Sequence, residues 1–156
     1  MKLVNSHYLL IAALLGLSTL FDSSYPLAKA QSEPKPGCQA TVDKILQEIR
    51  SKGVEKASFR VLKGTANNFH TGNPTNRTDE LQIILGYSFY SRQDPVIRQK
   101  EMDLIEKILN SGILLNWSND IVSTCNNTAI VTFGPAGSDN TRHFYIKSDG
   151  TTKLGE

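Results

Sequence analysis

Residues 79–90 read DELQIILGYSFY, and this stretch decides the fold because its apolar side chains recur at every second position. A period of two is typical of a β-strand that buries one face. One face carries Leu81, Ile83, Leu85, Tyr87 and Phe89. The other face carries Gln82, Ile84, Gly86, Ser88 and Tyr90. We therefore expect a sheet at the centre of the fold, with the flanking segments covering it.

A helix is predicted after this strand. Asp94 followed by Pro95 is typical of a helix start, because Asp caps free N–H groups and proline fits the first helical position. Gly112 is the expected end of this helix. Its apolar side consists of Ile97, Leu104, Ile105, Ile108 and Leu109. Residues 113–125 (ILLNWSNDIVSTC) allow two interpretations, a strand or a short helical turn that leads into one.

The C-terminal segment predicts a meander of short antiparallel strands. Thr128–Gly134 and Arg142–Lys147 have the composition of strands, and residues 135–141 (PAGSDNT) are expected to form the turn between them. Asp149–Gly150 is a hairpin signal. Residues 151–154 should therefore form a short edge strand.

Upstream, the chain predicts one more helix and one more strand. The helix is expected to begin with Thr41 as its N-cap and to end at Gly53. Its apolar stripe consists of Val42, Ile45, Leu46 and Ile49. Residues 56–63 (KASFRVLK) alternate as a half-buried strand does. Residues 64–78 (GTANNFHTGNPTNRT) are expected to be a long exposed loop, and loops of this length are often functional or mobile.

Together these elements predict an α+β fold, with two helices packed on one face of an antiparallel sheet of four to five strands. The chain has two cysteines, Cys38 and Cys125, and we expect them to form one disulfide. The chain-entropy view values so long a closed loop at about 4–5 kcal/mol. A reactive Cys125 with His143 as its base is the alternative, but a catalytic thiol needs a lowered pKa and an orienting partner.

The N-terminal residues predict export. Lys2 gives a positive start, residues 8–21 (YLLIAALLGLSTLF) are uncharged and mostly apolar, and Ala28-Lys29-Ala30 has the small-x-small pattern of a cleavage site. As a helix the apolar run would span about 21 Å, less than the roughly 30 Å core of a bilayer. We therefore expect a signal peptide and no stable membrane span after cleavage, with an uncleaved anchor as the alternative.

The expected organisation is a signal peptide over residues 1–30 cleaved after Ala30, an extended tether over residues 31–37 (QSEPKPG), and a single α+β domain over residues 38–156. Two prolines within three residues favour extended backbone in the tether. The mature protein would lie in a periplasm, a lumen or the medium, where disulfides persist.

The last third of the chain has a recognisable pattern. A cysteine is followed by a strand that ends in Val-x-Phe-Gly, an Asx/Thr-rich turn, an aromatic strand and an Asp-Gly-Thr hairpin. The residues are Cys125, Val131–Gly134, Asp139–Thr141, Phe144-Tyr145 and Ser148–Thr151. This part resembles a group of small exported cyanobacterial proteins of unknown function. The resemblance implies bacterial export and adds no activity.

Charge and motifs exclude several classes of function. The chain carries 17 Lys and Arg against 15 Asp and Glu, and its basic residues are scattered, so no nucleic-acid partner is expected. His70 and His143 lack the spacing of metal ligands, and a zinc site needs three or four convergent ligands. No catalytic residue, metal or cofactor is predicted.

One binding surface is predicted. If both helices cover the same sheet face, then Tyr90, His143 and Tyr145 share the other face, and such polar-aromatic side chains suit contact with a sugar or a peptide. The leading hypothesis is a non-catalytic binding or assembly module with an extracytoplasmic protein or glycan as its partner. One alternative is a small secreted hydrolase that uses residues 64–78 with His70 or His143. The other is an inhibitor that presents the same loop to a protease.

Overall fold

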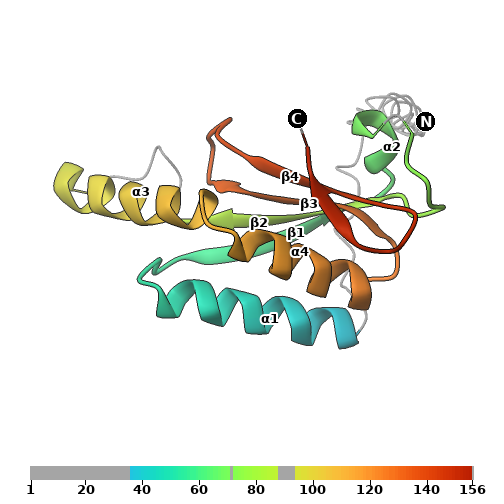
Figure 1. Cartoon of the computed structure of the whole chain (residues 1–156). Helices are drawn as coiled ribbons and strands as arrows, with labels where there is room; N and C mark the ends of the chain where they lie inside the picture. The colour runs from blue at the N-terminus through green and yellow to red at the C-terminus, as the bar shows by residue number, and fades with distance from the viewer. Residues whose placement is uncertain (1–35, 71, 88–93, 156) are drawn as a thin grey trace, which may run out of the picture.

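The computed structural model describes residues 36–70, 72–87 and 94–155. Its elements in chain order are α1 (Pro36–Ser51), β1 (Ala57–Leu62), α2 (Ala66–Phe69), β2 (Asp79–Leu85), α3 (Pro95–Leu109), α4 (Ile113–Thr124), β3 (Thr128–Pro135), β4 (Arg142–Ile146) and β5 (Thr152–Leu154). These elements confirm the α+β class (Figure 1). The expected signal peptide, its cleavage site, residues 31–35 and Tyr90 lie outside the described residues.

Five strands form one sheet in the order β1-β2-β3-β4-β5. The pairs are antiparallel except for β2 and β3, which run parallel. This parallel pair differs from the antiparallel sheet that the sequence predicts. The connection between the two strands explains the difference. A tight turn would make them antiparallel, whereas the crossover through α3 and α4 lets β3 run in the same direction as β2.

The helix α4 is the largest difference from the sequence prediction. Residues 113–125 were expected to be a strand or a short helical turn that leads into one. The strand interpretation is wrong, and the helical one is right in kind but too short, because Ile113–Thr124 is a helix of 12 residues followed by β3. Its buried side chains have the i, i+3, i+4, i+7, i+8 spacing of a one-sided helix. They are Leu114, Trp117, Ser118, Ile121 and Val122. Gly112, expected to end α3, stands at the N-cap of α4.

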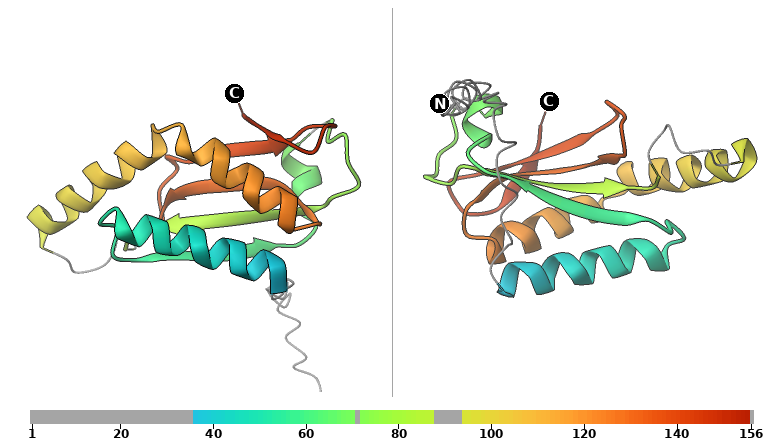
Figure 2. Two further views of the ribbon diagram at one scale, coloured as in Figure 1. Left: turned by 60° about the horizontal axis from the view of Figure 1, so that its bottom comes forward. Right: turned by 180° about the vertical axis from the view of Figure 1, so that it is seen from behind.

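The core lies between the sheet and three helices. The helices α1, α3 and α4 contact the sheet and lie on the same side of it (Figure 2). Leu81, Phe133 and Ile83 are among the side chains that this layer buries completely or almost so. Trp117 joins two of the helices, because its indole N–H donates to the Glu48 carboxylate of α1 at 2.8 Å. The helix side of the sheet therefore carries the hydrophobic core.

The first helix begins earlier than the sequence predicts. It starts at Pro36 and not at Thr41, so Pro36 and Gly37 of the expected tether are its first residues. Proline is favourable there because the first helical N–H groups have no partner within the helix. Thr41 is not an N-cap, since its hydroxyl donates back to the Gly37 carbonyl at 3.2 Å. The end near Gly53 is as predicted, and this glycine has a φ of 96°.

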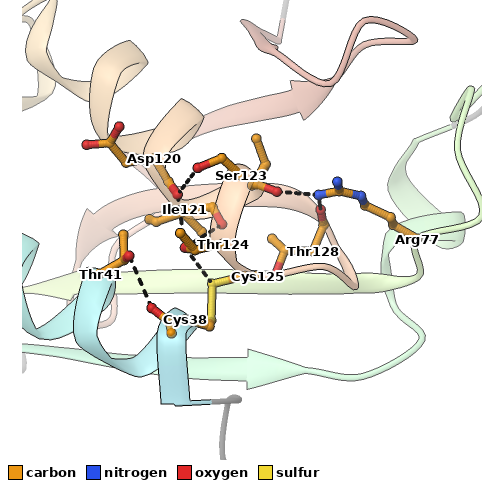
Figure 3. The surroundings of a disulfide bond; sticks show 11 residues. Cys38, Thr41, Arg77, Asp120, Ile121, Ser123, Thr124, Cys125 and Thr128 are labelled. Carbon is orange, nitrogen blue, oxygen red and sulfur yellow. Dashed lines mark hydrogen bonds between the residues drawn. A yellow bond between two sulfur atoms is a disulfide. The ribbon is translucent and has the colours of Figure 1, made fainter.

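The predicted disulfide between Cys38 and Cys125 is present (Figure 3). It joins the first turn of α1 to the C-cap of α4, and both cysteines are buried. Beside it, the Arg77 guanidinium donates to the carbonyls of Val122 and Thr128. A cation at the carbonyl end of α4 also complements the helix dipole. The bridge and Arg77 therefore fix the same end of α4 from two sides.

Residues 64–78 are more structured than the exposed loop that the sequence predicts. They include the short helix α2, whose Ala66 is fully buried and whose Ala66 N–H donates to the Thr78 carbonyl at 3.0 Å. Asn73 closes the rest of the segment, because its side chain donates to the Arg77 carbonyl and accepts from the Thr75 N–H. Local asparagine and threonine bonds of this kind replace a sheet or helix ladder.

Candidate functional site

The face of the sheet opposite α1, α3 and α4, called here the open face, carries most of the polar strand residues. Residues paired across neighbouring strands lie on the same face, so the strand registers define this set. It consists of Ser58, Arg60, Leu62, Glu80, Gln82, Ile84, Ile130, Thr132, Gly134, His143, Tyr145 and Lys153. The right-hand view of Figure 2 shows α2 on this side of the sheet, at one end. His143 and Tyr145 thus lie together on the face not used by the three long helices.

Three ring side chains lie in a row on the open face. The ring centroids of His70 and Tyr145 are 4.8 Å apart, and those of Tyr145 and His143 are 6.4 Å apart. The rings of His143 and Tyr145 are within 24° of parallel. His70 comes from the end of α2, so residues 64–78 contribute directly to this surface. The sequence did not place His70 beside Tyr145, because that contact depends on the fold of α2.

A chain of side-chain hydrogen bonds runs across the open face beside these rings. On β1 and β2, the Arg60 guanidinium donates to the Gln82 amide oxygen at 2.6 Å, and the Gln82 amide donates to the Glu80 carboxylate at 2.7 Å. On β3, the Thr132 hydroxyl donates to the same carboxylate oxygen at 2.7 Å. The chain then reaches β4, because His143 Nδ1 lies 2.9 Å from the Thr132 hydroxyl. Four strands are therefore connected by one network.

The hydrogens in this network can be assigned. A threonine hydroxyl has one proton and accepts through its lone pairs. Thr132 gives its proton to Glu80, so it must accept from His143, and Nδ1 of His143 therefore carries a hydrogen. The other ring nitrogen, Nε2, lies 2.9 Å from the hydroxyl of Thr141. In its neutral form His143 thus accepts a hydrogen bond from Thr141.

Glu80 is the buried member of the network. It is 4% exposed, and its neighbours in register are Leu62 and Ile130. A buried carboxylate is costly unless hydrogen bonds satisfy it, and here Gln82 and Thr132 both donate to it. The network therefore holds the polar side chains in fixed positions before any ligand arrives.

Two glycines make room for the outer members of the site. A Cβ on Gly155 would collide with the Tyr145 ring, and a Cβ on Gly134 would lie 2.6 Å from the Thr141 methyl group. Glycine in or beside a strand often marks such a close approach. Tyr145 and Thr141 can therefore lie close against the backbone of their neighbours.

Cys38 and Cys125 are both in the disulfide, so neither is a free thiol. Among residues 36–70, 72–87 and 94–155, no group of three or more His, Cys, Asp or Glu side chains is arranged to hold a metal ion. Within the same ranges, no helix is long and apolar enough to cross a membrane.

Comparison of the chain with protein-family models, with curated proteins and with solved structures gave no match. The function therefore has to be inferred from the side chains themselves. Five members of the network were not predicted from the sequence as site residues, namely Arg60, Glu80, Gln82, Thr132 and Thr141. Alternation places Glu80 and Gln82 on one face of β2, but only the strand order brings Thr132 and His143 beside them.

Proposed function

We propose that the chain is an exported extracytoplasmic protein that binds its partner, without catalysis, on the open face. Export is supported by the signal-like residues 1–30, by the disulfide, which is typical of oxidising compartments, and by the resemblance to small exported cyanobacterial proteins. The binding role is supported by one observation above all, the row of His70, Tyr145 and His143.

The chemistry of the open face favours a glycan. Flat rings with an apolar body and a polar edge suit packing against the C–H faces of a sugar. Exposed donors stand on either side of the rings, since Arg60 and Lys153 lie on the same face. The hydrogen-bonded network fixes this surface in advance, which lowers the entropy that binding has to overcome.

A glycan array probed with the labelled domain (residues 36–156) tests this role. We expect binding to a set of glycans that Tyr145→Ala and His70→Ala reduce by about tenfold or more, as loss of a central aromatic contact does. Lys44→Ala is the matched control, because Lys44 is exposed on α1. Equal binding by all three variants, or binding to no glycan, would exclude the open face as a glycan site.

The intact mass of the natively exported protein tests its location. We expect a mass that begins at Gln31 and alkylation of the cysteines only after reduction. An unprocessed N-terminus would contradict cleavage after Ala30, and two freely alkylated thiols would contradict the oxidising compartment. Neither outcome depends on the ligand, so export and binding are tested separately.

A hydrolase is the second candidate, and one observation favours it. The Thr141 hydroxyl, the two ring nitrogens of His143, the Thr132 hydroxyl and the Glu80 carboxylate follow one another at hydrogen-bond distances. A hydroxyl beside a histidine that a carboxylate orients is the arrangement that activates nucleophiles, and here Glu80 reaches His143 through the Thr132 hydroxyl. Hydrolysis of p-nitrophenyl acetate above the buffer rate, lost in both Thr141→Ala and His143→Ala, would favour this candidate over the binding role.

A further inference from the structure

A second surface lies on the helix side of the sheet, away from the open face. It is a groove of about 550 Å³ between the α3–α4 junction and the last two strands, within the range of about 300–1,000 Å³ found for small-molecule sites. Figure 1 shows the α3–α4 junction and the strands that border it. The lining residues are Leu109, Asn110, Ser111, Gly112, Leu114, Leu115, Arg142, Phe144, Thr152, Lys153 and Leu154.

The middle of α4 is bonded to the first residue of β5, and the groove lies beyond this attachment. The Asn119 side chain accepts from the N–H and the hydroxyl of Thr152, and the buried Ser118 hydroxyl lies 2.6 Å from that hydroxyl. One turn earlier on the helix, Leu115 is 41% exposed, and two residues later on the strand, Leu154 is 52% exposed. These two side chains form the rim of the groove, so apolar surface is left open to solvent there.

The floor is apolar and one end is positive. Leu114 and Phe144 are buried beneath the rim. The half-buried Arg142 donates to the Asn110 side chain at 3.1 Å, and its other acceptors, on Asn140 and Thr141, are also neutral oxygens. None of the lining residues is Asp or Glu. The side chain of Lys153 points to the open face, by its pairing with Tyr145, so Arg142 is the cation of this groove.

A groove with an apolar floor, a single guanidinium and no acid is complementary to a molecule with one anionic head and one apolar tail. We propose that it binds a free single-chain fatty acid, with the carboxylate on Arg142 and the acyl chain over Leu114, Phe144 and Leu154. Arginine is well suited to this head group, because its fork of N–H donors matches a carboxylate. The uncapped first turn of α4, beginning after Gly112, adds positive potential at the same end.

A peptide added to the edge of β5 fits less well. The strand has three residues, and the outward N–H of Thr152 is already bonded to Asn119. Little main-chain edge therefore remains for pairing. The short edge and the single cation both favour a small amphiphile.

Titration calorimetry with octanoate, decanoate and dodecanoate below their micelle concentrations tests the proposal. We expect binding that tightens by about fourfold for each added CH₂ group, the value for its burial from water. Arg142→Gln and Leu115→Glu should each weaken dodecanoate binding by about tenfold or more. Ile97→Glu is the matched control, because Ile97 is 60% exposed at the far end of α3. Near-ultraviolet circular dichroism of each variant confirms that it is folded.

Three outcomes would overturn the proposal. One is the absence of dodecanoate binding to the folded wild type. Another is equal binding of dodecyltrimethylammonium, which would remove the role of Arg142. The third is displacement of dodecanoate by a short peptide with an apolar C-terminal residue at equal or higher affinity, which would identify a peptide site. Dodecanoate should change the amide chemical shifts of Leu115 and Leu154 in the groove and leave that of His143 on the open face unchanged. Fatty-acid binding is therefore tested separately from glycan binding.

Discussion

At the scale of single residues, Thr132 has the most consequential position on the open face. Its hydroxyl links the buried Glu80 carboxylate to the His143 ring. Removing one partner of a buried polar group costs more than the bond itself, because the group left behind stays desolvated.

We therefore expect Thr132→Val to lower the free energy of unfolding by about 1–3 kcal/mol. Thr132→Ser, which keeps the hydroxyl, should lose much less. Urea denaturation followed by the fluorescence of Trp117, the single tryptophan, measures both. If the two variants have the same stability, the hydroxyl bridge does not stabilise the fold.

The same geometry predicts the tautomer of His143. Because Thr132 accepts from Nδ1, neutral His143 should carry its hydrogen on Nδ1, the less common form in free histidine. Nitrogen-15 chemical shifts of the two ring nitrogens at neutral pH report this directly. A hydrogen on Nε2 would contradict the assignment. In Thr132→Val, the preference of neutral His143 for the Nδ1–H tautomer should be lost.

Residue-level prediction from the sequence succeeded where one strand decides the outcome. The alternation of β4 places His143 and Tyr145 on one face, and the structure has them so. Alternation cannot say which strand lies next to β4, and for that reason Thr132 and Glu80 were missed. The row of rings also depends on His70, whose position is set by α2 and not by any periodic pattern.

At the scale of elements, local signals located most of the boundaries. Asp94 caps α3 as predicted, with its carboxylate accepting from the Val96 N–H at 2.7 Å, and Pro95 follows it. The failure was α4, because residues 113–125 contain apolar runs that fit a strand as well as a helix. The side chains that decide between them are Trp117 and Ser118, which pack against α1 and β5.

The cap gives a prediction for α3. Asp94→Ala should lower the free energy of unfolding by about 1 kcal/mol, the usual value of a lost N-cap, with hydrogen exchange fastest in the first turn of α3. Asp103→Ala, on the exposed side of the same helix, is the control. Equal effects of the two substitutions would mean that the cap adds nothing beyond charge.

The β4–β5 hairpin has its own prediction. The Thr151 hydroxyl, the Lys147 ammonium group and the Thr151 N–H, in this order of importance, hold the pKa of Asp149 well below its usual range. Because the pKa of Asp149 is lowered in the folded state, its charged carboxylate stabilises the hairpin at pH values above the ordinary pKa of 3.8. This stabilisation is lost as the pH falls from that value through the lower, folded one.

Exchange of the Thr151 amide hydrogen measures the effect. We expect strong protection in the wild type at pH 5 and weaker protection in Asp149→Asn at the same pH. Asp139→Asn is the control in the preceding turn. It should leave exchange of the Thr151 amide unchanged, because Asp139 accepts from the Thr141 N–H through its backbone carbonyl and the substitution keeps that bond. Full protection of Thr151 in Asp149→Asn would exclude the carboxylate as its partner.

At the scale of the whole molecule, the disulfide should contribute the most of any single feature. Replacing both Cys38 and Cys125 with serine should lower the free energy of unfolding by up to about 4–5 kcal/mol, the chain-entropy value for a loop this long. Thermal and urea denaturation of the oxidised wild type and the double variant measure the difference. An unchanged melting temperature would show that packing alone holds α1 against α4.

Composition and pattern predicted the α+β class and the bridge, but not the direction of the central strands. Strand direction follows from how the chain returns to the sheet. The crossover through α3 and α4 could not be predicted while residues 113–125 were interpreted as a strand or a short helical turn. A single error of element type therefore changed the topology at the centre of the sheet, while the faces predicted for β1, β2 and β4 agree with the structure.

The position of the bridge has a further consequence for a protein that would work among secreted proteases. Cys38 and Cys125 are 87 residues apart, so one cut of the backbone anywhere between them leaves two pieces that remain covalently joined. After a cut between β2 and β3, the fragment with β1 and β2 and the fragment with β3, β4 and β5 would also stay paired along the parallel β2–β3 pair of the sheet. A singly cut molecule would then migrate as one band in a non-reducing gel, and it would keep both the open face and the groove.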